Sequence, residues 1–503
     1  MTIKNWLGWF AVAFGFLLVL FADFLPLPLG GYDSQRMFLV VVLIAVVSIS
    51  IPLLGWREPA EIARQIWPGM LVAIAFISLP VFSASVTQYL WVEPGMYALF
   101  FLGTIIAGSA IALKSAERYW VDVFVTVALA FAFFYGALSI VIYVYAMLDN
   151  VPELSAYIPW GFINIRYWSH VATWLLPLMP LGVLVVPLEN QRLWRALVAL
   201  TAAIWWWLVI VSMSRGTMFG LTFGTLLVVL LFGQSVKPWA FVFFRYLVFG
   251  VLAWLLLSVF VPSLLSGDIQ ARGINTTSSG RVPLWIEAWA MSVQQLPLGL
   301  GPQSWLTHDV LTEPFRKSTR FGHPHNMYLM WAAEYGWLLM LALFVMGAAG
   351  FTRLWKKRTA LMASADPSIP ILAAFAASVA AALVHAGVSA VFIAPASMLV
   401  GLCVLSIFWA LVYIGTRKTG INEVVHGSTR RTLVPVVLCI LTLVGCGFWA
   451  KEVWRYEQAM EVDLPYYDDH IPVGIMPRFW LQGYFPRAAE LMPPMESNSS
   501  SRQ

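Results

Sequence analysis

Residues 196–233 read ALVALTAAIWWWLVIVSMSRGTMFGLTFGTLLVVLLFG, two apolar runs separated by Ser214-Arg215-Gly216. Each run, 196–212 and 216–233, is close to the ~20 residues that an α-helix needs to cross the ~30 Å of hydrocarbon in a bilayer. Arginine is costly inside hydrocarbon, so we expect Arg215 at the membrane surface, where one spanning helix ends and the next begins. This stretch therefore predicts two membrane helices with a cation between them.

The composition of the whole chain agrees with that reading. Of its 503 residues, 60% are hydrophobic and 11% are charged, against roughly 45–50% and about 25% in ordinary soluble domains. This excludes a soluble enzyme. The formal net charge is only +5, so the chain as a whole is not a basic nucleic-acid binder. The three cysteines lie in apolar runs and are expected to be small core residues without a disulfide framework.

Apolar runs long enough to span a bilayer recur along the chain, and we expect an all-α, polytopic integral membrane protein with about 13 transmembrane helices. The runs are 6–29, 37–54, 67–90, 95–113, 120–148, 167–188, 196–212, 216–233, 239–265, 327–350, 370–392, 395–415 and 432–450. Short external loops then carry only Arg36, Arg166 and Arg215, as the positive-inside rule requires. The N-terminus is expected in the cytoplasm, and the long loop 266–326 and the tail 451–503 on the other side.

The external loop contains one predicted surface helix. Ser278-Ser279-Gly280 precedes Arg281-Val-Pro-Leu-Trp, which offers a serine N-cap and a proline in the first turn. Trp285, Trp289 and Leu296 then recur at helical spacing. We expect this helix to lie flat on the membrane with its aromatic face among the lipid headgroups.

Arginines at the outer surface are the first candidate site residues. A guanidinium forms bidentate hydrogen bonds with phosphate oxygens, and Gly216 beside Arg215 would let a backbone come close. The alternative for Arg215 is an ordinary snorkelling contact with lipid headgroups. Arg281 begins the predicted surface helix, whose dipole also favours an anion, or is a solvated loop arginine. Arg166 is a third outer cation, or an interfacial anchor beside Tyr167 and Trp168.

The sequence His323-Pro324-His325-Asn326, just before the run 327–350, is the second candidate. A neutral imidazole can accept a proton from an attacking hydroxyl near pH 7. A metal site is a rival interpretation, which the intervening proline and the missing third ligand weaken, and a purely structural histidine pair is another. Glu334 follows His325 by more than two helical turns, so the two are not expected to pair directly within one helix.

The predicted topology brings these cations and the imidazole to one membrane face, although they are far apart in the chain. Phosphate clamps with a proton acceptor suit a lipid-linked phosphate donor, whose tail could lie among the spans. The arginines would hold its anionic leaving group. No redox cofactor or nucleotide-binding loop is visible, and no cofactor is expected.

At this point the chain resembles the O-antigen ligase family, which shares its core with O-antigen polymerases and bacterial protein O-oligosaccharyltransferases. The resemblance covers about 196–350. It is carried by Ser214-Arg215-Gly216, by Gly280-Arg281 followed by Trp285 and Pro297-Leu-Gly-Leu-Gly301, and by His325-Asn326 with nine residues before Gly336.

The resemblance implies a GT-C-like fold and a metal-independent, inverting transfer of a glycan from undecaprenyl diphosphate to an acceptor hydroxyl, on the periplasmic side of the bacterial inner membrane. Arg215 and Arg281 would hold the diphosphate, and His325 would activate or orient the acceptor. Arg166, His323 and Asn326 are further candidate substrate-binding residues. The acceptor stays open between lipid A-core and a pilin-like serine or threonine, and we expect a monomer.

The chain is accordingly divided into an N-terminal bundle (1–195), a ligase-like core (196–350), C-terminal membrane helices (351–450) and a short periplasmic tail (451–503). Thirteen spans and an external tail depart from the twelve-span pattern of lipid A-core ligases and look more like protein O-oligosaccharyltransferases. A polymerase of glycan repeats would use the same clamps. A lipid-linked glycan transporter is a further alternative, but neither midplane charges nor inverted repeats with broken helices are evident in the sequence.

Overall fold

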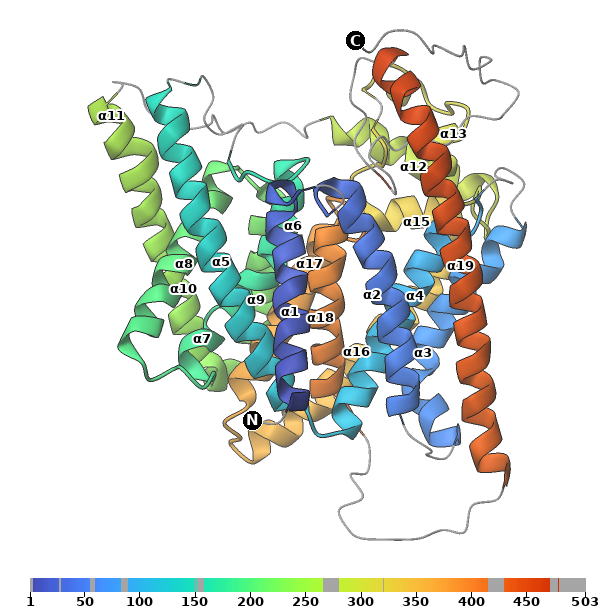
Figure 1. The fold of residues 1–503 in the computed structure, drawn as a ribbon, viewed down its shortest axis with the longest axis horizontal. Helices are drawn as coiled ribbons and strands as arrows, with labels where there is room; N and C mark the ends of the chain where they lie inside the picture. Colours follow the sequence, from blue (N-terminus) through green and yellow to red (C-terminus); the bar gives the residue numbers. More distant parts are fainter. Residues whose placement is uncertain are drawn as a thin grey trace.

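A computed structural model describes residues 3–26, 29–54, 59–82, 89–149, 151, 158–265, 280–319, 321–414, 429–470 and 478. Within these ranges the regular structure is entirely helical, with no strand. Long helices run side by side in one bundle, and short helices lie across one of its ends (Figure 1). The prediction of an all-α polytopic protein is therefore confirmed.

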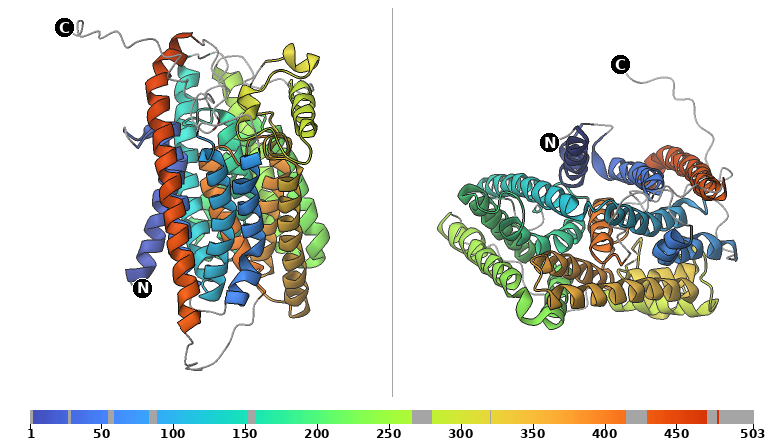
Figure 2. Two further views of the ribbon diagram at one scale, coloured as in Figure 1. Left: turned by 90° about the vertical axis from the view of Figure 1, so that its right-hand side faces the viewer. Right: turned by 90° about the horizontal axis from the view of Figure 1, so that it is seen from below.

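The helices of the first half of the chain are α1 (Ile3–Phe21), α2 (Gly31–Leu53), α3 (Pro59–Ser78), α4 (Val92–Leu113), α5 (Glu117–Leu148), α6 (Ile165–Leu175), α7 (Leu181–Leu184), α8 (Arg192–Val211), α9 (Arg215–Phe232), α10 (Lys237–Trp254) and α11 (Val261–Leu265). Those of the second half are α12 (Arg281–Gln294), α13 (Ser304–Thr307), α14 (Glu313–Arg316), α15 (Met327–Tyr335), α16 (Trp337–Ala363), α17 (Ile369–Ala386), α18 (Pro395–Leu411) and α19 (Thr429–His470). α19 runs along the edge of the bundle beside α2 (Figure 2).

The outer surface of the bundle is apolar. Leu230 on α9 is 81% exposed and Phe344 on α16 is 73% exposed, which suits side chains that face lipid. Among the described residues, nine helices are long and apolar enough to cross a membrane. One of these, Arg215–Leu264, joins α9 and α10, which are separated where Gly233 (φ 56°) ends α9. The total of thirteen spans stays a prediction.

Two of the predicted runs are broken helices. The run 167–188 consists of α6, the 3-10 turn η4 (Leu176–Leu178) and α7, and the run 327–350 is divided at Gly336 into α15 and α16. Gly336 has φ 85°, and a side chain there would collide with the backbone of Pro297 and Gly299. The Trp337 N–H donates to the Pro297 carbonyl at 2.9 Å. The loop after α12 is therefore fastened to the break between α15 and α16.

Glycines bring α9 directly against α17. A methyl group on Gly216 would lie 2.5 Å from His385 Nε2, and methyl groups on Gly220 and Gly224 would collide with the backbone carbonyls of Ala381 and Ala377. Small residues at such contacts allow close packing where lipid gives no hydrophobic driving force between helices. The structure thus gives Gly216 a helix-packing role, whereas its sequence position had suggested backbone approach to a ligand.

Substitution Gly220→Ala is expected to destabilise the protein by about 1–3 kcal/mol, because the obstructing atom is a backbone carbonyl that cannot rotate away. Gly347→Ala is the matched control, since nothing lies within 4 Å of a methyl group at that position on α16. It should be neutral or slightly stabilising, as alanine favours helix by up to ~1 kcal/mol. Thermal unfolding in detergent, followed by size-exclusion chromatography, compares the two. Equal midpoints would contradict the packing role.

α12 lies with α13 and α15 at the end of the bundle opposite the N-terminus (Figure 1). Its N-cap is Gly280 (φ 71°), so the prediction of a serine N-cap is wrong; Ser278 and Ser279 lie outside the described residues. Pro283 is in the first turn, as predicted. The exposed apolar stripe consists of Val282, Ile286, Trp289, Val293 and Leu296. Trp285 instead packs inward against the cluster around Leu284, Ala288 and Met291.

Candidate functional site

Arg215 and Arg281 each occupy the first position of a helix, α9 and α12. The first N–H groups of a helix lack partners within it, and the helix dipole adds partial positive charge there. Neither N-cap residue, Ser214 or Gly280, makes a side-chain capping hydrogen bond. The Ser214 hydroxyl is instead hydrogen-bonded to Ser212 at 2.7 Å. Each arginine therefore adds its charge to a helix end that already favours an anion.

Asparagines cap the other two helices that carry candidate residues. The Asn164 side chain accepts from the Arg166 N–H at 2.9 Å at the start of α6, and the Asn326 side chain accepts from the Leu329 N–H at 3.0 Å at the start of α15. The side-chain oxygen of Asn326 is thus engaged in holding α15. Its predicted part in substrate binding stays a prediction.

Two of the candidate arginines act electrostatically on the third. Burial first, and then the charges of Arg166 and Arg215, lower the pKa of Arg281 to about 10. The group remains charged at pH 7, and its Nε has no hydrogen-bond partner among the described residues. The positive charges of Arg166 on α6 and Arg215 on α9 thus act on Arg281 at the start of α12, an arrangement that favours an anion beside Arg281.

His323 and His325 lie beside these cations. Their rings are 4.4 Å apart between centroids, and the His325 backbone N–H donates to His323 Nδ1 at 3.1 Å. Both are at least 96% buried, and the Phe321 ring lies 5.1 Å from that of His325. His325 adopts φ 55°, a left-handed conformation that costs a non-glycine residue ~1–2 kcal/mol. Strain of this kind persists where surrounding structure enforces it, and it is common at functional sites.

The imidazole of His325 is neutral at pH 7. Burial, above all, and the neighbouring His323, Arg166 and Arg281 hold its pKa well below the ordinary 6.5. Burial and the charges of Arg478 and Arg166 likewise lower the pKa of His323 to about 3. His325 Nδ1 is buried and has no hydrogen-bond partner within the described ranges. It can therefore accept a hydrogen bond from a ligand hydroxyl.

We expect the rate of the reaction to be constant between pH 8 and pH 6. An imidazole with a pKa of 6.5 would be about three quarters protonated at pH 6 and would lose its action as a base. The lowered pKa of His325 keeps the neutral form dominant as the pH falls through this range. Initial rates with saturating substrate test this. An acid limb with its midpoint near pH 6.5 would show that His325 is not the limiting base.

Two further histidines were missed by sequence reasoning. His170 on α6 and His385 on α17 have rings 4.9 Å apart. His170 Nε2 is hydrogen-bonded to Ser389 at 2.7 Å, and His385 Nδ1 to Thr173 at 2.8 Å. His170 lies one helical turn after Arg166, a spacing that could have indicated it. His385 is the single ionisable residue in the apolar run 370–392, which was the other available signal.

Further polar contacts at this end of the molecule join α12 to the loop that follows it. Glu287, on the inner face of α12, accepts hydrogen bonds from the backbone N–H groups of Leu311 and Thr312 at 2.7 and 2.9 Å and is hydrogen-bonded to His308 at 2.9 Å.

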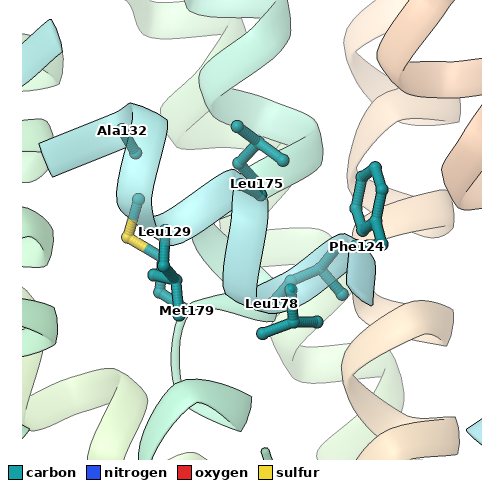
Figure 3. A pocket seen from close by; sticks show the side chains of 8 residues that line it. Phe124, Leu129, Ala132, Leu175, Leu178 and Met179 are labelled. Carbon is teal, nitrogen blue, oxygen red and sulfur yellow. The ribbon is translucent and has the colours of Figure 1, made fainter. Parts of the chain in front are cut away.

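A small apolar pocket lies elsewhere, between α5 and the broken segment α6–η4, and is lined by Leu129, Leu175 and Met179 among others (Figure 3). In the part of the chain that the structure describes, no three His, Cys, Asp or Glu side chains form a metal-binding group.

These features define a polytopic membrane protein with a cationic, imidazole-containing site at one end of its bundle. Residues 197–344 match a family model described as O-antigen ligase. This match places residues 197–344 in the O-antigen ligase superfamily and supports a function of the O-antigen ligase or polymerase type in general. The match includes Arg215, Arg281 and His325 but not Arg166. No curated protein matches the chain.

Proposed function

We propose that this protein transfers an oligo- or polysaccharide from undecaprenyl diphosphate to an acceptor hydroxyl at the periplasmic face of the bacterial inner membrane. The observation that carries the proposal is the meeting of two arginine-headed helix N-termini, α9 and α12, with a buried neutral imidazole. The N-terminus would then lie in the cytoplasm, and the site and the chain after α19 in the periplasm.

In this mechanism Arg215 and Arg281 bind the diphosphate, with Arg166 as a third cation. The acceptor oxygen attacks the anomeric carbon of the sugar, its proton passes to His325, and the bond from that carbon to the diphosphate oxygen breaks. Attack opposite the leaving group inverts the anomeric configuration. The arginines and the helix dipoles stabilise the charge that develops on the diphosphate. Because they supply that positive charge, the reaction requires no metal ion.

The membrane bundle supports a lipid-linked donor rather than a soluble one. Lipid-facing apolar side chains such as Leu230 continue along α9, whose first residue is Arg215. A polyprenyl chain could lie against such a surface while its diphosphate reaches the outer end of the helix. The acceptor is either lipid A-core or a pilin-like serine or threonine, and we expect the protein to act as a monomer.

The test is transfer by the purified protein in liposomes that contain undecaprenyl diphosphate-linked glycan. Lipid A-core and a pilin-like peptide are supplied in separate reactions. Glycan on either acceptor supports the proposal and identifies the acceptor. Lengthening of the glycan on its own carrier would instead identify a polymerase, and movement of the donor across the bilayer without transfer would identify a transporter. A strain lacking the protein, examined for lipopolysaccharide and pilin glycan, gives the matching result in cells.

A further inference from the structure

A buried arginine from the chain beyond α19 lies between two buried carboxylates. Arg478 Nε and Nη2 donate to the two carboxylate oxygens of Glu93 on α4 at 3.0 and 2.9 Å, and Nη2 also pairs with Glu334 on α15. The side chains of all three residues are at least 99% buried. One guanidinium thus pairs with two carboxylates from helices far apart in the sequence.

The backbone of Arg478 is held as well. Its carbonyl oxygen accepts a hydrogen bond from the Tyr32 hydroxyl at 2.7 Å and another from Arg36 Nη2 at 2.9 Å. Tyr32 and Arg36 are one turn apart on α2. Arg478 therefore connects α2, α4 and α15 through its own main-chain and side-chain atoms.

A continuous set of contacts runs from Arg478 to the histidines. Glu334 accepts from the Trp305 backbone N–H at 3.1 Å, and the Trp305 indole N–H donates to the Phe321 carbonyl at 2.7 Å. Phe321 is the residue whose ring lies against His325. The charge of Arg478 also acts directly on His323. The position of the imidazole thus depends on a carboxylate that only Arg478 neutralises among the contacts described.

We propose that Arg478 is a positioning residue for the histidine site, acting through Glu334, Trp305 and Phe321. The proposal gives the chain after α19 a role in the proposed transfer reaction, on which it rests. Removing one partner from a buried ion pair leaves an uncompensated charge, which is strongly destabilising. Here the loss of one guanidinium leaves two carboxylates without a cation. α15 must shift or the carboxylates must take up protons, and either change displaces the loop that holds His325.

The predicted kinetic effect of Arg478→Ala is a fall in kcat of about 100-fold, the size expected when a reacting group is misplaced by ~1 Å. KM for the donor should change little, because Arg215 and Arg281 remain. His323 is faced by Arg478, Arg166, Arg281 and His325. Loss of the Arg478 cation raises the pKa of His323. Arg478→Lys keeps the charge but loses the bidentate guanidinium fork, so its kcat should lie between those of the wild type and Arg478→Ala.

A second measurement does not depend on transfer activity. Diethyl pyrocarbonate labelling of His323 and His325, mapped by mass spectrometry, should be slow in the wild type and at least ~10-fold faster in Arg478→Ala. Both side chains are at least 96% buried and become accessible to the reagent only when their surroundings loosen. Arg455→Ala is the matched control. Arg455 is 62% exposed and pairs with Glu452 at 3.7 Å on the surface of α19, and its loss should change neither labelling nor rate.

The triple variant Arg478→Met, Glu93→Gln, Glu334→Gln separates positioning from simple loss of folding. It removes all three charges together, so it should recover protection of His325 relative to Arg478→Ala. Recovered protection with slow labelling supports the proposal. Unchanged labelling and kcat in Arg478→Ala would overturn it. If the wild type transfers no glycan, the proposed function fails, and labelling still decides whether Arg478 holds the histidines.

Discussion

His325→Ala is expected to lower kcat by about 10²–10⁴-fold, the usual contribution of a positioned general base. The side chain is the neutral imidazole of the site, with a buried Nδ1 that has no partner among the described residues and a ring held between His323 and Phe321. Binding of the donor should persist, because the arginines belong to α9 and α12.

His325→Gln is the informative companion variant. Glutamine retains hydrogen-bonding atoms of similar reach but cannot accept a proton near neutral pH. If the residue removes the proton, the glutamine variant should be as slow as the alanine variant in the liposome transfer reaction. If the glutamine variant keeps activity within threefold of wild type, the imidazole orients the acceptor and does not act as a base.

Arg281→Ala is expected to lower kcat by about 10²–10³-fold, comparable to the loss of one donor in an oxyanion hole. The residue begins α12, and burial followed by the charges of Arg166 and Arg215 lowers its pKa. Arg281→Lys should also be impaired, because lysine keeps the charge but loses the bidentate fork. Arg215→Ala should lower kcat by a similar factor. The double variant Arg215→Ala, Arg281→Ala should raise the activation free energy by less than the sum of the two single effects.

Arg316→Ala provides the control for charge in the same external loop. Its guanidinium is 64% exposed and forms only a surface pair with Glu313 at 3.7 Å, a kind of contact worth ~0–1 kcal/mol. Its rate should stay within twofold of wild type. Single-turnover rates with the lipid-linked donor compare the set. Wild-type rates in both Arg281→Ala and Arg215→Ala would show that these residues take no part in the reaction.

The parts of the molecule that could be predicted from sequence are those that depend on local pattern. Apolar length predicted the helices, and the cost of arginine in hydrocarbon placed Arg215 where α8 ends and α9 begins. Topology then predicted that Arg215, Arg281 and His325 would share one end of the bundle, and charge effects on Arg281 and His325 agree with this. Their roles in the reaction stay predictions.

What escaped the sequence depends on packing between distant segments. The pairing of Arg478 with Glu93 and Glu334 joins residues more than 140 positions apart, and no local periodicity encodes such a partner. The break at Gly336 was also invisible, because its cause is the backbone of Pro297 and Gly299 arriving from another segment. The apolar runs 167–188 and 327–350 look continuous until such neighbours are in place.

The exposed apolar stripe on α12 makes the position of Arg281 depend on the lipid or detergent around the protein. Trp289 is 53% exposed and its ring lies 5.6 Å from that of Trp337, the first residue of the lipid-facing helix α16. We therefore expect the helix that begins with Arg281 to lie where bilayer and water meet. Short-chain detergents form micelles that are thinner than a bilayer. We expect them to let α12 change its position and to lower the transfer rate without unfolding the protein. Adding back long-chain phospholipid should restore the rate.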